Sequence, residues 1–273
     1  MAANIIVLIT GANTGLGLAT VKSLLQSADK TYTILLGGRS LEKATSAAQQ
    51  VKEEFACSQS VVAPVQIDIE DDQSIKNLFE SLEKDYGRLD VLVNNAGSQF
   101  DQKLSSGELS MRQMWNKSWD VNVTGTHILT YTLIPLLLKS SDPRLLFITS
   151  GVSTLAESGN QAVRINHSPP DKGWPKAGGA FAALGVPAYR ASKTGLNMVM
   201  REWVRVLKED NVKVWCVSPG LLATGLGFGN PERLKQMGAL DPSVGAGVVR
   251  DVVEGKRDED VGCVVRKDGI QPW

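Results

Sequence analysis

The sequence predicts a doubly wound α/β fold, in which helices cover both faces of a mostly parallel, Rossmann-like sheet. Three observations favour this class. Short apolar runs rich in β-branched residues alternate with longer segments of helical period along most of the chain. The composition does not change along the 273 residues and no repeat is present, so a single domain spanning 1–273 is expected. A glycine-rich turn, Thr10–Gly17, directly follows the first apolar run.

The first half of the chain alternates regularly between expected strands and helices. The β-branched apolar runs predict buried strands at 4–10, 32–36, 61–67, 89–93 and 145–149. Apolar residues at spacings of three and four, such as Leu41, Ala44 and Ala48, place one face of each intervening segment against the sheet. These segments are the helices expected at 15–27, 41–55, 75–86 and about 111–139.

The second half departs from this pattern. A segment at about 151–187 is rich in Gly, Pro, Ser and Ala and has no sustained period, which indicates an insertion. Helical spacing returns from Leu196 to Leu207, and strands are expected at 212–217 and near 262–265. A glycine-rich loop begins at Pro219. Ligands of such sheets bind beyond the carboxyl ends of the strands, so the loops after the strands should surround one site.

Composition and charge exclude several classes of function. Lys+Arg 29 and Asp+Glu 29 balance, which leaves no electrostatic footprint for nucleic acid or an anionic membrane. The three cysteines lie far apart and the two histidines have no partners at ligand spacing, so neither a disulfide framework nor a metal site is expected. The first apolar run is too short for a signal peptide and no run approaches a membrane span. A cytoplasmic protein that binds small molecules is therefore expected.

The glycine-rich turn is a candidate site for a dinucleotide. It lies between the first strand and the first helix, where a diphosphate can meet free backbone N–H groups at the positive end of the helix. Its G-x-x-x-G-x-G spacing also suits an ordinary tight turn, but its place in the strand-turn-helix unit favours cofactor binding. The residues expected to contact the cofactor are Gly11, Asn13, Thr14, Gly15, Leu16 and Gly17.

The end of the second strand points to the type of cofactor. NAD-preferring proteins of this architecture place a carboxylate there, whereas this chain has Gly37-Gly38-Arg39-Ser40. The guanidinium of Arg39, assisted by Ser40, suits a 2′-phosphate and gains little from a neutral pair of hydroxyls. NADP(H) is therefore expected rather than NAD, although a solvated arginine at the start of a helix is the alternative.

Tyr189 and Lys193 form a candidate proton-transfer pair. They lie four residues apart at the start of the helix that follows the insertion, so they project from the same face. A tyrosine hydroxyl titrates near 10, and a neighbouring ammonium favours the phenolate. Such a pair can bring the hydroxyl toward working pH as a proton donor and acceptor. Taken alone, the Tyr-x-x-x-Lys pattern is short enough to arise by chance.

Taken together, these motifs resemble those of the short-chain dehydrogenase/reductase family, in the same order and over nearly the whole chain. The residues that carry the resemblance are Thr10–Gly17, Asp68-Ile69, Asn94-Asn95-Ala96-Gly97, Asn122, Ser150, Tyr189 with Lys193, and Pro219-Gly220. Within the family the chain is most similar to the NADPH-dependent carbonyl reductases. It shares with them the arginine after the second strand, the insertion before the tyrosine and an apolar tail ending in Trp273.

The resemblance implies a role for each catalytic residue. Tyr189 would donate a proton to the oxygen of a carbonyl substrate while NADPH supplies a hydride to the carbon. Ser150 would orient that oxygen. Lys193 would lower the pKa of Tyr189 and hold the nicotinamide ribose, and Asn122 would position a water that links Lys193 to solvent. Each of two residues also has a purely structural alternative. Ser150 would then simply end a strand, and Asn122 would simply satisfy backbone groups inside a helix.

The resemblance also implies further cofactor contacts. Asp68 and Ile69 would meet the adenine, and Asn94 would lie on the adenosine side of the pocket. Leu222 and Thr224 would lie near the nicotinamide carboxamide. The segment 94–97 is also a good structural turn, and both interpretations can hold together.

Two segments depart from the usual family pattern. Ser150 and Tyr189 are farther apart in sequence than in most members, and the extra loop, with Trp174, Pro175 and Phe181, is expected to roof the substrate pocket. A similar insertion in carbonyl reductases covers the face that other members use to form tetramers, so a monomer and a homo-oligomer both stay open. The loop at about 219–240 resembles a substrate lid lined for apolar carbonyls.

The sequence thus predicts an NADPH-dependent reductase of a hydrophobic ketone or aldehyde, which is reversible in principle as an alcohol dehydrogenase. A dedicated ketoreductase of secondary metabolism, acting on one polyketide or polycyclic ketone, is the alternative within the same chemistry. A non-catalytic NADP(H) sensor or scaffold is the alternative from another class. The complete set of Asn122, Ser150, Tyr189 and Lys193 argues against the sensor, which has no need of a proton relay.

Overall fold

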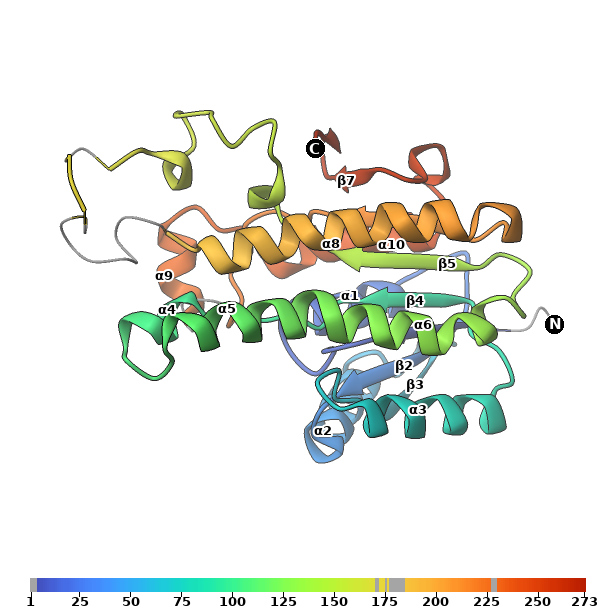
Figure 1. Ribbon diagram of the computed structural model, residues 1–273. Coiled ribbons are helices and arrows are strands. Elements are labelled where there is room, and N and C mark those ends of the chain that lie inside the picture. Colours follow the sequence, from blue (N-terminus) through green and yellow to red (C-terminus); the bar gives the residue numbers. More distant parts are fainter. Residues whose placement is uncertain (1–3, 170–171, 175, 177–184, 227–229) are drawn as a thin grey trace.

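The fold is a single sheet between two layers of helices, as the sequence predicts (Figure 1). The computed structural model describes residues 4–169, 172–174, 176, 185–226 and 230–273. Within them the strands pair in the order β3-β2-β1-β4-β5-β6-β7-β8, and every neighbouring pair is parallel except β7 with β8. The strands are β1 (Ile5–Ile9), β2 (Tyr32–Gly38), β3 (Val61–Gln66), β4 (Val91–Asn94), β5 (Arg144–Ile148), β6 (Lys213–Val217), β7 (Val264–Arg266) and β8 (Gly269–Gln271).

Each face of the sheet buries its own apolar cluster. Alternate residues of a strand point to opposite faces, so Leu8 of β1 belongs to one cluster while Val7 and Ile9 belong to the other. One face is covered by α3 (Asp72–Asp85), α6 (Thr126–Leu137) and α8 (Pro187–Val206). The opposite face is covered by α1 (Gly15–Leu25), α2 (Leu41–Glu54) and α10 (Pro242–Val253). These clusters hold the sheet rigid and leave the loops at its carboxyl edge free for a site.

The short helices gather at that carboxyl edge. Figure 1 shows the arrowheads of β4 and β5 pointing toward α4 (Asp101–Ser105), α9 (Pro231–Gln236) and the first turns of α8. No prediction was made for α4, α9, α10 or the antiparallel strand β8. In α10 the apolar period is interrupted by glycine, and Gly245 packs closely against Pro219, since a Cβ there would lie 2.9 Å from Pro219 Cβ and 3.1 Å from its carbonyl oxygen.

The prediction of one continuous helix at about 111–139 is wrong. The chain forms α5 (Met111–Trp119), then a π-helical turn, η1 (Asp120–Gly125), and then α6. A π-helical turn inserts a residue into the helical ladder and is frequent at functional sites. Gly125 within it faces the main chain of Ile69 so closely that a side chain could not fit. Asn122 therefore lies on a bulged turn rather than inside a regular helix.

The insertion at about 151–187 is only partly described. It contains two 3₁₀ turns, Gly151–Ser153 and Arg164–Asn166, and Trp174 is exposed. Pro175 and Phe181 lie outside the described residues. A roof over the substrate pocket stays a prediction.

Within the described part of the chain, no helix combines the length and the apolar character that a membrane crossing requires.

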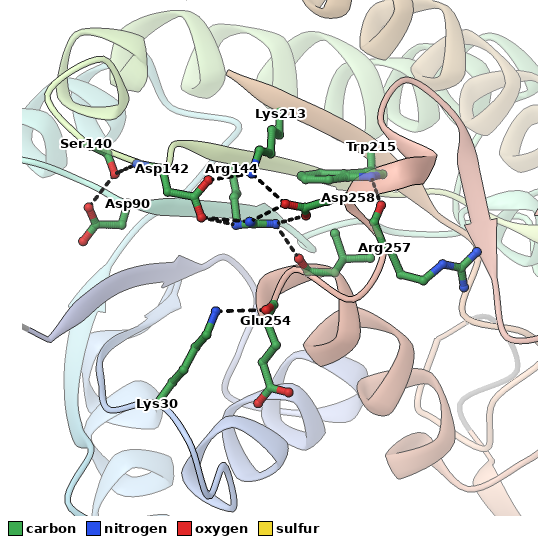
Figure 2. Close-up of polar contacts among 11 residues, drawn as sticks. Lys30, Asp90, Ser140, Asp142, Arg144, Lys213, Trp215, Glu254, Arg257 and Asp258 are labelled. Atoms are coloured by element: carbon green, nitrogen blue, oxygen red, sulfur yellow. Dashed lines mark hydrogen bonds and ion pairs between the residues drawn. The ribbon is translucent and has the colours of Figure 1, made fainter. Parts of the chain in front are cut away.

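An ion-pair network around the buried Arg144 lies at the amino-terminal edge of the sheet, away from the loops discussed so far (Figure 2). Arg144, at the start of β5, is 4% exposed, and its guanidinium contacts Asp258 at 2.6 Å and Asp142 at 2.8 Å. Lys213 of β6 bridges the same two carboxylates at 2.6 Å and 2.9 Å. The guanidinium also lies 5.5 Å from the ring centre of Trp215. The network ties β5 and β6 to the segment after α10.

Asp258→Asn is expected to destabilise the protein by about 2 kcal/mol at pH 7, because it leaves the buried Arg144 with one carboxylate fewer. Hydrogen bonds and charge from Arg144 lower the pKa of Asp258 to about 2. A lowered folded pKa stabilises the protein above the unfolded pKa, and this contribution is lost as the pH falls through the folded value. The difference in unfolding free energy between wild type and variant should therefore shrink from about pH 4 downward.

Urea unfolding at pH 7 and at pH 3 measures this difference. Glu202→Gln, which removes one partner of an exposed ion pair with Arg205, serves as the control and should change stability little. A difference for Asp258→Asn that is the same at both pH values would contradict the assignment.

Candidate active site

The glycine-rich turn lies at the carboxyl end of β1 and is too tightly packed for larger residues. Gly11 and Gly15 have φ of 62° and 57°, in the left-handed region that favours glycine. A Cβ on Gly17 would lie 2.6 Å from the carbonyl oxygen of Gly11 and 2.6 Å from Asn95 Nδ2. A Cβ on Gly15 would lie 3.5 Å from Thr224 Cβ, so the structure brings Thr224 against the turn.

The start of α1 offers free backbone donors. Thr14 makes no side-chain capping hydrogen bond to any described residue. By contrast, Ser40 accepts from Lys43 N at the start of α2, at 3.3 Å. The first N–H groups of α1 therefore stand at the positive end of the helix without a side-chain acceptor. Together with the glycines, this arrangement fits the diphosphate of a dinucleotide.

Asn95 links the glycine-rich turn to the loop after β4 through hydrogen bonds. The sequence predicted no individual role for this residue. Its Nδ2 donates to the carbonyl oxygens of Thr10 and Gly11, at 2.7 Å and 3.2 Å. Thr10 Oγ1 accepts from the backbone N–H groups of Asn95 and Ala96. Asn94 is buried, and its Nδ2 donates to Thr130 Oγ1 of α6 at 3.0 Å. The side chain of Asn94 is thus engaged with the helix layer, and segment 94–97 acts at least as a structural turn.

The residues expected on the adenosine side lie at the ends of β1, β2 and β3. A Cβ on Gly38 would lie 3.3 Å from Asn13 Oδ1, which joins the turn to the end of β2. The side chain of Arg39 is 72% exposed, with Nη1 3.7 Å from a carboxylate oxygen of Glu70. The exposed guanidinium is free to turn toward an anionic phosphate.

The loop after β3 stands next to this arginine. Asp68 Oδ1 accepts from Glu70 N at 3.1 Å, which shapes the turn, and Ile69 is buried. Leu16 of α1 packs partly buried against the apolar cluster of the α1 face. Contacts of Asp68, Ile69 and Leu16 with a cofactor stay predictions.

Three of the four predicted catalytic residues converge where β5 ends and α8 begins. Lys193 Nζ donates to the carbonyl oxygen of Ile148 at 2.8 Å and lies 5.9 Å from the centre of the Tyr189 ring. Ser150 follows β5, and its hydroxyl is a hydrogen-bond partner of Tyr189. Two hydroxyl groups therefore stand side by side, as the binding of one carbonyl oxygen requires.

The pKa shifts at this site follow from burial. Burial raises the pKa of Tyr189 above its usual value, and the hydrogen bond with Ser150 opposes that rise. Burial also lowers the pKa of Lys193 to about 8, against the effect of the neighbouring Cys216. The pKa of Tyr189 is therefore raised, whereas the resemblance implies that Lys193 lowers it. The ammonium of Lys193 is bound to a main-chain oxygen, and Tyr189 stays protonated near neutral pH.

Asn122 joins the site through the loop after β4. It is fully buried; its Oδ1 accepts from Ser98 N at 2.9 Å, and its Nδ2 donates to Ser98 O at 2.8 Å and Ser192 Oγ at 3.0 Å. A Cβ on Gly97 would lie 3.0 Å from Asn122 Oδ1 and 3.2 Å from Lys193 Nζ. Asn122 thus satisfies backbone groups of a neighbouring loop rather than of its own helix, and it stands close to Lys193. The water that it would position stays a prediction.

Sequence reasoning missed Asp101, which holds the start of α8. Its carboxylate is 1% exposed and accepts from Ala188 N at 2.9 Å and from Tyr189 N at 3.2 Å. Burial raises its pKa. Asp101 therefore caps α8 from α4, an element far away in the sequence. No local pattern could have shown this, because the partners are far apart in the chain.

A buried network of hydrogen bonds holds the main chain of Ser150. The sequence did not predict this network. The carbonyl oxygen of Ser150 accepts from Ser153 Oγ at 2.6 Å and from Gln271 Nε2 of β8 at 3.1 Å. Asn197 of α8 donates to Ser153 Oγ at 3.0 Å and accepts from Thr149 Oγ1 at 2.6 Å. The catalytic loop is thus bound both to α8 and to the C-terminal strand.

Arg190 attaches the insertion to the catalytic helix. It directly follows Tyr189 and donates to the carbonyl oxygens of Val152 and Ile165, each at 3.2 Å, and to Asn166 Oδ1 at 2.8 Å. Planar guanidinium donors hold such acceptors in fixed directions. The described part of the insertion is therefore bound to the residue next to Tyr189.

The two ends of the loop predicted to be a substrate lid, at about 219–240, pair with each other. Leu222 is buried and forms a parallel bridge with Leu240, in which Ala223 N donates to Leu240 O at 2.8 Å and Leu240 N to Leu221 O at 2.9 Å. The bridge holds the two ends of the segment together around α9. Substrate and cofactor contacts of this loop stay predictions.

Comparison with known proteins finds a family match over most of the chain. The family model of the short chain dehydrogenases matches residues 5–162 and 177–233. A short-chain dehydrogenase/reductase from a Phoma species, eupG, is 45% identical, over 98% of this chain and 97% of its own. A second, tropE from Talaromyces stipitatus, is 44% identical, over 98% of this chain and 97% of its own.

Solved structures share the fold at low sequence identity. The NADPH-bound carbonyl reductase from chicken fatty liver aligns with a TM-score of 0.75 at 19% identity, over 99% of this chain and 100% of the other. The L-sorbose reductase from Gluconobacter frateurii, in complex with NADPH and L-sorbose, aligns with a TM-score of 0.72 at 20% identity, over 98% and 97%. Both alignments confirm the doubly wound fold.

Proposed function

Because the chain belongs to the short-chain dehydrogenase/reductase family, whose members are oxidoreductases of alcohols and carbonyls, we propose that it uses NADPH to reduce a hydrophobic ketone or aldehyde. The observation that carries this proposal is the convergence of Ser150, Tyr189 and Lys193 at the carboxyl edge of the sheet. The uncapped start of α1 lies at the same edge.

The chain's own residues supply the acid half of the reaction. When bound, NADPH supplies the hydride that goes to the carbonyl carbon. Ser150 and Tyr189 both donate hydrogen bonds to the carbonyl oxygen, which stabilises the negative charge that develops there. Tyr189 then transfers its proton to that oxygen, and its raised pKa keeps the proton in place until it is needed. Lys193, whose Nζ donates to the carbonyl oxygen of Ile148, would hold the nicotinamide ribose.

The preference for NADPH rests on Arg39 and on the lack of an acidic residue in Gly37-Gly38-Arg39-Ser40. A 2′-phosphate gains a charge-assisted, bidentate contact from a guanidinium, whereas ribose hydroxyls gain little. The chicken carbonyl reductase and the Gluconobacter L-sorbose reductase, both described with NADPH, make such a preference reasonable on this fold.

Arg39→Asp is expected to lower kcat/KM for NADPH by about tenfold to a hundredfold, since a charged hydrogen bond contributes about 1.5–3 kcal/mol. The carboxylate repels the 2′-phosphate and suits ribose hydroxyls, so kcat/KM for NADH should rise relative to that for NADPH. Initial rates with both cofactors measure the ratio. Arg205→Asp, at an exposed site of α8 remote from the turn, is the control. An unchanged ratio in Arg39→Asp would show that Arg39 is only a surface residue.

The function itself is tested by the loss of nicotinamide absorbance when the protein is mixed with NADPH and a panel of quinones, aryl ketones and aliphatic aldehydes. Turnover of several unrelated carbonyls is the result expected. Turnover of one polycyclic or polyketide-like ketone alone would favour the dedicated ketoreductase. Binding of NADPH without turnover of any member would overturn the proposed reductase and favour the sensor.

A further inference from the structure

The short loop between β4 and α4 carries an amide that has no partner. Both polar atoms of Gln99, Nε2 and Oε1, are buried from solvent without a hydrogen bond, and Gln99 is the described side chain for which this holds at both ends. Asn94, Gln102 and Gln271 each have one unpaired buried atom, and the other end of Asn94 and of Gln271 is engaged, with Thr130 and with Ser150 respectively.

An unpaired buried amide is costly. Each buried donor or acceptor without a partner costs about 1–3 kcal/mol, and buried polar groups in native proteins almost always have a protein, water or ligand partner. Leucine would fill similar space at position 99 without this cost. The amide therefore points to a partner that arrives from outside the chain.

The loop that carries Gln99 is fixed at both ends to catalytic residues. On one side, both main-chain polar groups of Ser98 are held by the amide of Asn122, at 2.9 Å and 2.8 Å. On the other side, Asp101 accepts the backbone N–H of Tyr189 at 3.2 Å. Gln99 thus lies in the short link, residues 98–101, between Asn122 and the helix that carries the proton donor.

Chain geometry places Gln99 close to the reacting groups. A Cβ on Gly97 would lie 3.2 Å from Lys193 Nζ, and Gly97 precedes Gln99 by two residues. Two residues of fully extended chain span at most about 7 Å, so the Cα atoms of Gly97 and Gln99 lie within that distance. The loop follows β4 at the carboxyl edge of the sheet, where ligands of this fold bind.

From this placement we propose that the Gln99 amide is a subsite for a second oxygen atom of the substrate, next to the reacting carbonyl. The inference rests on the proposed reductase activity and narrows its substrate class. An amide can donate from Nε2 to a carbonyl oxygen and accept at Oε1 from a hydroxyl. Because it is neutral, it fits hydroxyl and keto oxygens rather than a phosphate. The substrate is therefore a β-dicarbonyl compound or a hydroxylated aryl ketone rather than a plain hydrocarbon ketone.

The test compares matched substrate pairs in the wild type and in Gln99→Leu. One pair is 2′-hydroxyacetophenone and acetophenone, and the other is a 1,3-diketone and the monoketone of equal chain length. The preference is the ratio of kcat/KM within a pair. Sites built to bind a polar substrate group discriminate strongly against analogues that lack it. We expect Gln99→Leu to lower the preference at least about tenfold in one pair or both while kcat/KM for the plain ketone is maintained.

Two controls separate this role from a structural one. Ser105→Ala changes an exposed residue of α4 and should leave both preferences unchanged. Gln99→Met provides a second apolar variant. Thermal unfolding establishes whether each variant is folded. Because each Gln99 variant removes an unpaired buried amide, its melting temperature should equal or exceed that of the wild type.

Three outcomes would overturn the subsite. Unchanged preferences in folded Gln99→Leu and Gln99→Met would mean that the amide binds water only. Equal losses for both members of each pair would indicate a structural role. If the wild-type protein oxidises NADPH with none of the carbonyl compounds tested, both the reductase proposal and the subsite are excluded. This result is distinct from the other two because it appears before any variant is made.

Discussion

Tyr189→Phe should lower kcat for carbonyl reduction by about a thousandfold, because general acid catalysis contributes roughly a hundredfold to ten-thousandfold. The change removes the hydroxyl that donates to the substrate oxygen and keeps the ring, whose centre lies 5.9 Å from Lys193 Nζ. Ser150 retains its own hydroxyl, so a single donor remains for the carbonyl oxygen. The loss should appear in kcat more than in KM, since the proton moves only in the reaction step.

Steady-state rates of NADPH oxidation, combined with fluorescence titration of NADPH, separate the two effects. The dissociation constant for NADPH should stay within about threefold of the wild-type value, since less than about 1 kcal/mol of cofactor binding is at stake. Tyr131→Phe, which alters an exposed tyrosine of α6, is the matched control and should keep full activity. Undiminished reduction of the test ketone by Tyr189→Phe would exclude Tyr189 as the proton donor.

Lys193→Met should abolish most turnover and yet leave the protein at least as stable at pH 7. Lys193 is 4% exposed, and burial lowers its pKa to about 8 from an unfolded value of 10.5. Below pH 8 the folded protein thus carries a buried charge at a cost of up to roughly 3 kcal/mol. Loss of the hydrogen bond to Ile148 O offsets part of this gain, by about 1–3 kcal/mol.

The sign of the pH dependence distinguishes this cost from an ordinary packing change. The destabilising contribution of Lys193 is full below pH 8 and disappears as the pH rises toward 10.5, because both states then bind few protons. The free energy of unfolding of Lys193→Met relative to wild type should therefore fall between pH 7 and pH 9.5. Urea unfolding at both pH values measures it, with the exposed Lys52→Met as control. A variant that is several kcal/mol less stable at both pH values would refute the assignment.

The elements predicted well are those with a local signal. Buried parallel strands such as Tyr32–Gly38 are short β-branched runs, and each sits close to its predicted bounds. The glycine-rich turn, Arg39 and the Tyr189–Lys193 pair are also local, because each follows from its place at the end of a strand or the start of a helix. The fold and half of the candidate site could be predicted on this basis.

The remainder of the site depends on contacts between distant segments. Asp101 caps α8 from another helix, and the amide of Asn122, on the π-helical turn η1, binds the main chain of Ser98. Arg190 lies between Tyr189 and Lys193, yet its three acceptors come from the loop after β5 and from the insertion. Such partners leave no period or spacing in the sequence. Burial likewise reversed the expected shift of the Tyr189 pKa, and burial is a property of the assembled fold.

The central claim is that the carbonyl carbon receives a hydride from the nicotinamide while Tyr189 protonates the oxygen. Mass spectrometry of the alcohol formed with NADPH that carries deuterium at both C4 positions tests it directly. We expect one deuterium on the carbinol carbon with the wild type and almost no alcohol with Tyr189→Phe. Alcohol without deuterium, or NADPH oxidised without any alcohol, would contradict the account.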